Sequence, residues 1–146
     1  MVTEICVSYR PRKHAMDRAV IKSPADAAKL ILCGFDKNTI MMQEEFVVMY
    51  LNRANHVLGI YKASKGGITG TVVDIRIILS IALKLLATSM MIAHNHPSGN
   101  LQPSVADQEI TIKLKEAAKF MDIKLLDHLI LVNSGESFSF AEEGYL

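Results

Sequence analysis

Hydrophobic residues recur along the chain with two periods, and the switches between them predict alternating strands and helices. Alternating or continuous apolar runs of strand length occur at residues 5–9, 46–51, 56–62, 90–93, 123–132 and 138–140. Apolar residues at helical spacing occur at residues 23–34, 73–88 and 104–121. Because helices and strands are intermixed, we expect an α/β or α+β fold around one mixed sheet.

Capping and turn residues define the ends of these elements. Ser23 is a predicted N-cap with Pro24 at the first helical position, and Gly34 is placed to end the same helix. The predicted inner face of this helix consists of Ala27, Leu30 and Ile31. Residues 52–55 are rich in turn formers and predict a hairpin between the two strands that flank them.

The longest apolar stretch, residues 77–93, is predicted to lie in a globular core rather than in a membrane. Lys84 interrupts it, and polar residues recur at every fourth position of the helix 73–88. This pattern indicates a largely buried helix with one narrow solvent-exposed stripe. The stripe consists of Arg76, Ser80, Lys84 and Thr88. We therefore expect no association with a membrane.

Composition narrows the class of protein. The chain has 146 residues, of which 50% are hydrophobic, and its 16 basic and 15 acidic residues give a formal net charge of +1. This length and hydrophobicity fit one folded domain and exclude a disordered chain. A net charge near zero argues against a strongly basic nucleic-acid-binding protein, so any contact with DNA would need a local basic patch.

Two cysteines bear on the cellular compartment. Cys6 and Cys33 are too few and too far apart for a disulfide framework or a thiolate zinc site, so we expect reduced, buried thiols. The first residues also lack the charged and apolar regions of a signal peptide. The expected location is the cytoplasm.

Candidate metal-ligating residues follow the apolar run 90–93. His94 and His96 are two positions apart, so on a strand both point to one face, about 6–7 Å apart, while Asn95 faces away. Asp107 lies in the first turn of the next predicted helix and can supply a third ligand. Two imidazoles and one carboxylate, with one position left for water, form the ligand set of a catalytic zinc site. Zinc bound in this way lowers the pKa of its water to about 7.

Such a site also needs a general base and a group that stabilises an oxyanion. Glu44 and Glu45 precede the predicted strand 46–51, and spacing alone does not rank them as the base. Ser104 could donate to the oxyanion. Ser104 and Asp107 also form a capping-box pattern, which taken alone is the favoured interpretation of that pair. Capping alone, however, does not explain the preceding His-x-His-Pro sequence.

These residues together resemble the JAMM (MPN-type) metalloprotease motif, and longer strings resemble the RadC family of bacterial JAMM-domain proteins. The strings are AHNHPSGN at residues 93–100, LDHLI at 126–130 and FSFAE at 138–142. The resemblance covers residues 23–146 as one domain and leaves 1–22 as an N-terminal strand and basic loop. It implies a JAMM/MPN-like, cytidine-deaminase-like fold, in which helices flank a mixed sheet.

The same resemblance assigns roles to the site residues. It implies zinc bound by His94, His96 and Asp107. It selects Glu44 as the general acid/base, because the family's glutamate stands two residues before the phenylalanine of the strand, and it makes Ser104 the oxyanion donor. Histidine and carboxylate ligands would also accept manganese, iron or nickel, so zinc is a preference.

The first functional hypothesis is a zinc-dependent hydrolase of the JAMM class that cleaves an amide, as a peptidase or isopeptidase acting on a peptide or protein. Glu44 would take a proton from zinc-bound water and later protonate the leaving amine, and Ser104 would stabilise the oxyanion. The alternative is a DNA repair or recombination module that binds or cleaves DNA, supported by the basic loop 10–14 and by the family's usual description. A catalytically idle scaffold is disfavoured, because the full constellation is present.

The remaining histidines have weaker interpretations. His128 is interpreted as a core residue, or as the less favoured alternative of a group that orients a ligand. His14 and His56 are interpreted as surface residues. An exposed edge strand would permit a homodimer.

Overall fold

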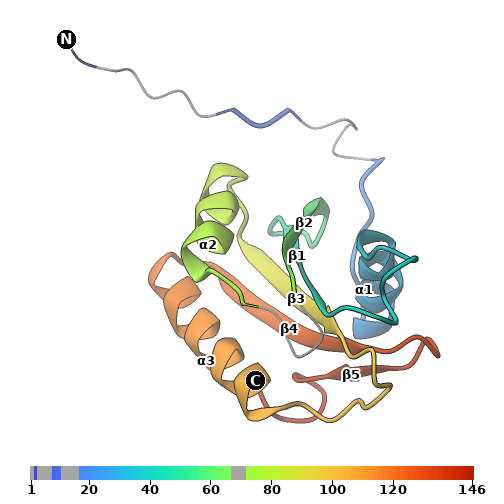
Figure 1. Ribbon diagram of the computed structural model, residues 1–146. Helices are drawn as coiled ribbons and strands as arrows, with labels where there is room; N and C mark the ends of the chain where they lie inside the picture. The colour runs from blue at the N-terminus through green and yellow to red at the C-terminus, as the bar shows by residue number, and fades with distance from the viewer. Residues whose placement is uncertain (1, 3–7, 11–16, 67–71) are drawn as a thin grey trace.

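A five-stranded mixed sheet forms the centre of the fold, with helices on both of its faces (Figure 1). The computed structural model describes residues 2, 8–10, 17–66 and 72–146. The strands lie in the order β2 (Val57–Lys65), β1 (Glu45–Leu51), β3 (Ser89–Asn95), β4 (Lys124–Leu131) and β5 (Ser137–Ser139). The pair β3–β4 is parallel, and the other neighbouring pairs are antiparallel. The expected mixed α/β fold and the hairpin of β1 and β2 are confirmed.

Helix α1 (Pro24–Ile31) covers one face of the sheet and has the predicted cap. Ser23 Oγ accepts a hydrogen bond from the backbone N–H of Asp26 at 3.1 Å. A short 3₁₀ helix, η2 (Leu32–Gly34), continues α1 to the glycine that was expected to end it. The buried residues of α1 are Ala27, Ala28 and Ile31. Leu30, predicted on the inner face, is only half-buried.

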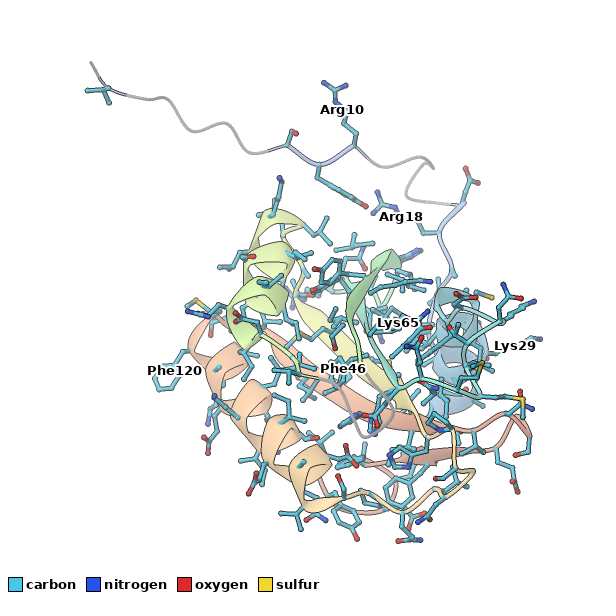
Figure 2. All side chains as sticks on the ribbon, in the orientation of Figure 1. Arg10, Arg18, Lys29, Phe46, Lys65 and Phe120 are labelled. Atoms are coloured by element: carbon cyan, nitrogen blue, oxygen red, sulfur yellow. The ribbon has the colours of Figure 1, made fainter. Side chains whose placement is uncertain are left out.

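Helices α2 (Ile75–Lys84) and α3 (Val105–Phe120) cover the other face. The polar residues Arg76, Ser80 and Lys84 of α2 are exposed, as predicted. The exposed side is wider than the predicted narrow stripe, because Ile77 and Leu83 are each 47% exposed. Only the side that carries Ile78, Leu79 and Ala82 is buried against the sheet. Phe120 likewise projects into solvent from the end of α3 (Figure 2).

The two central strands, β1 and β3, are buried on both faces. Successive side chains of a strand point to opposite faces, so each strand contributes to two apolar layers. The layer under α2 and α3 includes Phe46, Val48, Tyr50, Met90 and Ile92. The layer under α1 includes Val47, Met49, Leu51, Met91 and Ala93. Burial on both faces explains why these strands are continuous apolar runs rather than alternating ones.

Several local predictions have a different outcome. The thiol of Cys33 is exposed in η2 rather than buried. His56 is half-buried rather than on the surface, since Val20 pairs with it in an isolated β-bridge. Residues 8–10 form no strand, while Cys6, His14 and the rest of the predicted first strand lie outside the described residues. Within the described part of the chain, no helix has the length and hydrophobicity needed to cross a membrane.

Candidate metal centre

Two histidines lie at the C-terminal end of the central strand β3. His94 lies on the face covered by α2 and α3, where its ring is parallel to that of Phe46, its neighbour in β1, at a centroid distance of 6.1 Å. His96 follows the strand, and its backbone N–H donates to the carbonyl of Leu131 at 2.9 Å. Asn95 points to the opposite face, as predicted, and bonds to the segment before β1. The two imidazoles therefore share one side of the sheet.

The first turn of α3 brings a carboxylate to these histidines. Ser104 Oγ accepts a hydrogen bond from the N–H of Asp107 at 3.1 Å, and Asp107 Oδ2 accepts one from the N–H of Ser104 at 2.7 Å. This is the capping box that the sequence indicated. The other carboxylate oxygen, Oδ1, lies 3.1 Å from His94 Nε2. The capping and ligand interpretations of Asp107 are therefore compatible, because each uses a different oxygen.

The three side chains converge on one point. His94 Nε2 lies 2.9 Å from His96 Nε2, and His96 Nε2 lies 3.6 Å from Asp107 Oδ2. All three residues offer ligand atoms within 4.8 Å of one another. In a tetrahedral zinc site with bonds of about 2.0–2.1 Å, two ligand atoms are about 3.3 Å apart. The spacing of this cluster fits a metal ion.

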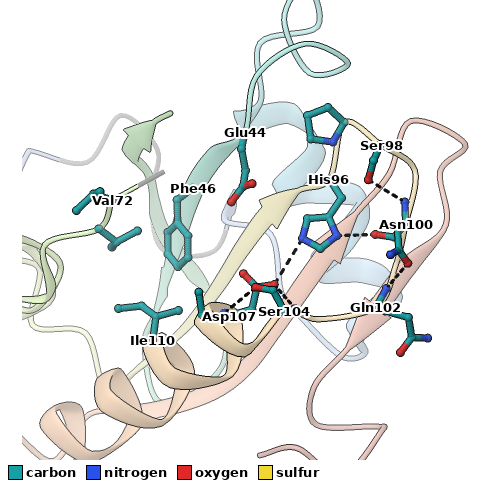
Figure 3. A pocket seen from close by; sticks show the side chains of 13 residues that line it. Glu44, Phe46, Val72, His96, Ser98, Asn100, Gln102, Ser104, Asp107 and Ile110 are labelled. Atoms are coloured by element: carbon teal, nitrogen blue, oxygen red, sulfur yellow. Dashed lines mark hydrogen bonds and ion pairs between the residues drawn. The ribbon is translucent and has the colours of Figure 1, made fainter. Parts of the chain in front are cut away.

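The imidazole of His96 is oriented by a backbone carbonyl. Its Nδ1 lies 2.5 Å from the carbonyl oxygen of Asn100, in the loop that joins β3 to α3 (Figure 3). Because a carbonyl oxygen only accepts, Nδ1 must carry the proton. Nε2 therefore keeps a free lone pair on the side that faces His94 and Asp107, as a metal ligand requires.

The electrostatics of the cluster favour a positive charge between these groups. Burial alone would raise the pKa of Asp107, but hydrogen bonds with His94 and His96 outweigh it and hold that pKa far below its usual range. The hydrogen bond with Asp107 raises the pKa of His96, with a smaller contribution from the charge of Glu44 and against the effect of burial. The carboxylate is thus ionised and attracts either a proton or a metal ion to the site.

The structure separates the two glutamates that spacing left equivalent. Glu44 lies with His96, Ser104 and Asp107 in the lining of one cavity of about 890 Å³ (Figure 3). Glu45 is the first residue of β1, and its side chain is buried on the opposite face. There its carboxylate accepts a hydrogen bond from Thr39 Oγ1 at 3.0 Å and lies 3.5 Å from Lys65 Nζ. Of the two, only Glu44 can reach the metal cluster. Its role as general acid/base stays a prediction.

The cavity has two chemically different walls on either side of the cluster (Figure 3). Apolar side chains line one side: Phe46, Val72 and Ile110. Polar side chains line the other side: Ser98, Asn100 and Gln102. This arrangement can bind a molecule that presents an apolar group and hydrogen-bonding groups to the metal cluster at the same time.

Sequence reasoning did not anticipate the surroundings of His94. His94 Nδ1 lies 2.7 Å from Nε2 of His128, which is fully buried in β4. Burial and the nearby His94 lower the pKa of His128 well below its usual value. His128 is therefore a core residue, as favoured. It also contacts the candidate ligand His94, and the less favoured alternative, that it orients a ligand, stays a prediction. Thr111 bonds to the other nitrogen of His128 and was missed, since one threonine on a helix carries no sequence signal.

Comparison with known proteins agrees with this geometry. The family model of the RadC-like JAB domain matches residues 21–145, which include the whole cluster. The chain belongs to the RadC family. The resemblance carried by the strings at residues 93–100, 126–130 and 138–142 is thereby confirmed, and the RadC-like JAB domain places the chain in a JAMM-like family.

Curated relatives of this RadC-like domain are bacterial UPF0758 proteins. The chain is 48% identical to one from Flavobacterium johnsoniae over 123 residues, which cover 80% of this chain and 53% of the relative. It is 40% identical to one from Porphyromonas gingivalis, over 74% of this chain and 48% of the relative. It is 38% identical to UPF0758 protein CPE2144 of Clostridium perfringens, over 89% and 56%. The chain spans about half the length of these relatives, and their names state no activity.

Proposed function

We propose that this RadC-like domain is a zinc-dependent hydrolase that cleaves an amide, in a peptide or isopeptide bond. One observation carries the proposal. The cluster of His94, His96 and Asp107 borders a cavity that also contains a carboxylate, Glu44, and a hydroxyl, Ser104. A metal, a general base and an oxyanion donor around one open space are the groups that metal-assisted amide hydrolysis uses.

The donor set fits zinc. When both imidazoles are neutral and unprotonated at Nε2, ligand atoms as close as those of His94, His96 and Asp107 repel one another, and a bound metal ion would remove that repulsion. Two neutral imidazoles and one carboxylate are the protein ligands of catalytic zinc sites, which keep a fourth position for water or substrate. When bound here, zinc would act as a Lewis acid that lowers the pKa of a water molecule to about 7.

The residues of the chain would then divide the proton transfers and the charge stabilisation. Glu44 would accept a proton from the attacking water and deliver it to the amine that leaves. Ser104 Oγ already accepts the N–H of Asp107, but its own hydroxyl proton is not used by that bond. This proton could be donated to the oxyanion that forms at the amide carbon. The apolar wall with Phe46 and Ile110 would limit access of other water molecules.

Metal analysis and peptide hydrolysis test this function with one pair of variants. We expect one zinc per chain in protein purified without chelator, and the same content in Glu44→Gln, since Glu44 is not a ligand. Hydrolysis of a fluorogenic peptide library should fall about 10²–10⁴-fold in Glu44→Gln, which is the usual contribution of a general base. The matched control is Glu45→Gln. The carboxylate of Glu45 lies on the other face of the sheet, so this variant should hydrolyse the peptides at near the wild-type rate.

Three results would each contradict the proposal. The first is an absence of bound metal in the wild type, and the second is metal retained in Asp107→Ala. The third is equal hydrolysis by the Glu44→Gln and wild-type proteins. The alternative of a DNA-associated module keeps only its sequence arguments, because residues 11–14 of the basic loop lie outside the described residues.

A further inference from the structure

A chain of three hydrogen bonds leads from one candidate metal ligand through the core and back to another. His94 Nδ1 lies 2.7 Å from His128 Nε2, and His128 Nδ1 lies 2.6 Å from Thr111 Oγ1. Thr111 Oγ1 in turn donates to the backbone carbonyl of Asp107 at 2.5 Å. These three hydrogen bonds thus join β3, β4 and α3 directly behind the metal cluster.

We propose that His128 and Thr111 are positioning residues that set the tautomer of His94, so that its Nε2 is unprotonated and available to the metal. The inference rests on the proposed metal site, but it concerns the protein before any metal binds. It assigns a function to two buried polar residues that take no part in the proposed hydrolysis.

The direction of each hydrogen bond follows from the last one in the chain. A backbone carbonyl has no proton, so the single hydroxyl proton of Thr111 must point to Asp107 O. Thr111 Oγ1 can then only accept from His128, which places the proton of His128 on Nδ1. A neutral imidazole carries one proton, so Nε2 of His128 is an acceptor. It accepts from Nδ1–H of His94, and this leaves the lone pair of His94 on Nε2.

The opposite direction would disable the site. If Thr111 donated its proton to His128 Nδ1, then Nε2 of His128 would donate to Nδ1 of His94. The proton of His94 would then lie on Nε2, the atom that faces His96 and Asp107. Thr111 would also lose its bond to the carbonyl of Asp107, in a region without access to water.

Burial makes the three residues depend on one another. His94 is 1% exposed, Thr111 2% and His128 0%, so water cannot replace a missing partner. The ring of His128 is also held by Phe140, which stacks on it at a centroid distance of 4.5 Å and an interplanar angle of 17°. A buried polar atom that loses its partner is destabilised, so burial favours the tautomer in which each of these three hydrogen bonds has a donor and an acceptor.

The chain of hydrogen bonds further couples the two elements that supply ligands. It starts at a ligand on β3 and ends at the backbone of a ligand on α3. Partners that orient a ligating histidine typically change metal affinity by about 10–100-fold when they are removed. His96 bonds directly to a backbone carbonyl, that of Asn100. His94 is linked to a backbone carbonyl only through His128 and Thr111.

The test compares substitutions that keep or remove each proton donor and acceptor. His128→Phe keeps a ring but removes both nitrogens, while His128→Gln offers an oxygen to accept from His94 and an amide N–H₂ to donate to Thr111. Thr111→Val removes the hydroxyl without changing the shape of the side chain, and Thr111→Ser restores it. Zinc affinity is measured by competition with a chromophoric chelator, and thermal unfolding of the zinc-free proteins checks that each is folded.

We expect zinc to bind about 10–100-fold more weakly to His128→Phe, and to recover most of this loss in His128→Gln. Thr111→Val should also weaken binding, and Thr111→Ser should not. A second measurement does not involve metal. The ¹⁵N shifts of the imidazoles in zinc-free wild-type protein, at about pH 8, should report His128 protonated at Nδ1 only, and Thr111→Val should show a mixture of both tautomers.

The proposal is overturned if zinc-free His128 carries its proton on Nε2, or if folded Thr111→Val binds zinc as tightly as Thr111→Ser. Should His128→Phe fail to fold, the two threonine variants decide the question. Should the wild type bind no zinc, the proposed function fails, while the tautomer of His128 still decides the present inference.

Discussion

Asn95 lies between the two histidines in sequence, but its side chain points to the other face of the sheet and bonds to the segment that precedes β1. Its amide nitrogen donates to the carbonyls of Ile40 at 2.6 Å and Gln43 at 2.9 Å, and its Oδ1 accepts from the N–H of Glu45 at 2.7 Å. These bonds hold the irregular segment that leads into β1. Glu44 belongs to that segment, so Asn95 fixes the position of the proposed general base without touching the cavity.

Replacing Asn95 should therefore separate hydrolysis from metal binding. Asn95→Ala leaves buried backbone groups without partners, and we expect the free energy of unfolding to fall by about 1–3 kcal/mol. We also expect the rate of hydrolysis to fall at least tenfold with zinc affinity nearly unchanged, because the imidazoles of His94 and His96 lie on the other face. Denaturant unfolding, chelator competition and peptide turnover measure the three effects.

A control for this experiment is Asn52→Ala. Asn52 Oδ1 accepts from two backbone N–H groups in the turn between β1 and β2, remote from the cavity. Its loss should lower stability without lowering turnover per folded molecule. Full turnover in Asn95→Ala would contradict the positioning role.

At the scale of elements, the sequence predicted the strands and helix caps that are determined by residues close together along the chain. The apolar run of β3 and the cap residues of α3 are local signals, and they brought His94, His96 and Asp107 into one hypothesis. The choice between Glu44 and Glu45 was not local, because a strand buried on both faces has no polar side to reveal its orientation. The contact of His94 with His128 depends on the parallel pairing of β3 with β4, which periodicity does not encode.

The short edge strand β5 is held by the buried carboxyl group of Asp127 in its neighbour β4. Asp127 Oδ2 accepts from Ser139 Oγ at 2.6 Å, and Oδ1 accepts from the N–H of Ala141 at 3.0 Å. Burial raises the pKa of Asp127 above its usual value, although these hydrogen bonds partly oppose the shift. A raised pKa means that the folded state favours the protonated form. The stabilisation from Asp127 is therefore complete below about pH 4, the pKa of an unfolded aspartate, and is lost as the pH rises through the raised value.

Asp127→Asn, which cannot ionise, should reveal this dependence. We expect the variant to be less stable than the wild type at about pH 4, because its amide matches the hydrogen-bond donors of Ser139 and Ala141 less well. The deficit should shrink as the pH rises and the wild-type carboxyl ionises. Urea unfolding of zinc-free protein from about pH 4 to pH 8 gives the difference in free energy. A deficit that grows with pH would show that the folded state favours the ionised carboxylate.

At the scale of the whole molecule, the site is assembled from distant parts of the chain at one edge of the sheet. The start of β1, the end of β3, the first turn of α3 and the middle of β4 each contribute one or two residues. Family resemblance linked these parts from the sequence, through strings that include His94 and His128. It could not supply the hydrogen bonds between them, since Thr111 and Asn95 act through contacts that only the folded chain creates.

Because the proposed ligands belong to β3 and α3, zinc should stabilise the whole fold. An ion that binds only the folded state adds about 2.7 kcal/mol at a free concentration 100 times its Kd. For a chain of this length, 1 kcal/mol corresponds to about 2–4 °C, so zinc should raise the Tm by roughly 5–11 °C. Calorimetry of untagged protein with EDTA and with excess zinc measures the shift. His94→Ala should lose most of it, whereas His56→Ala, whose ring lies on the edge hairpin, should keep it. An equal shift in His94→Ala would place the zinc elsewhere on the molecule.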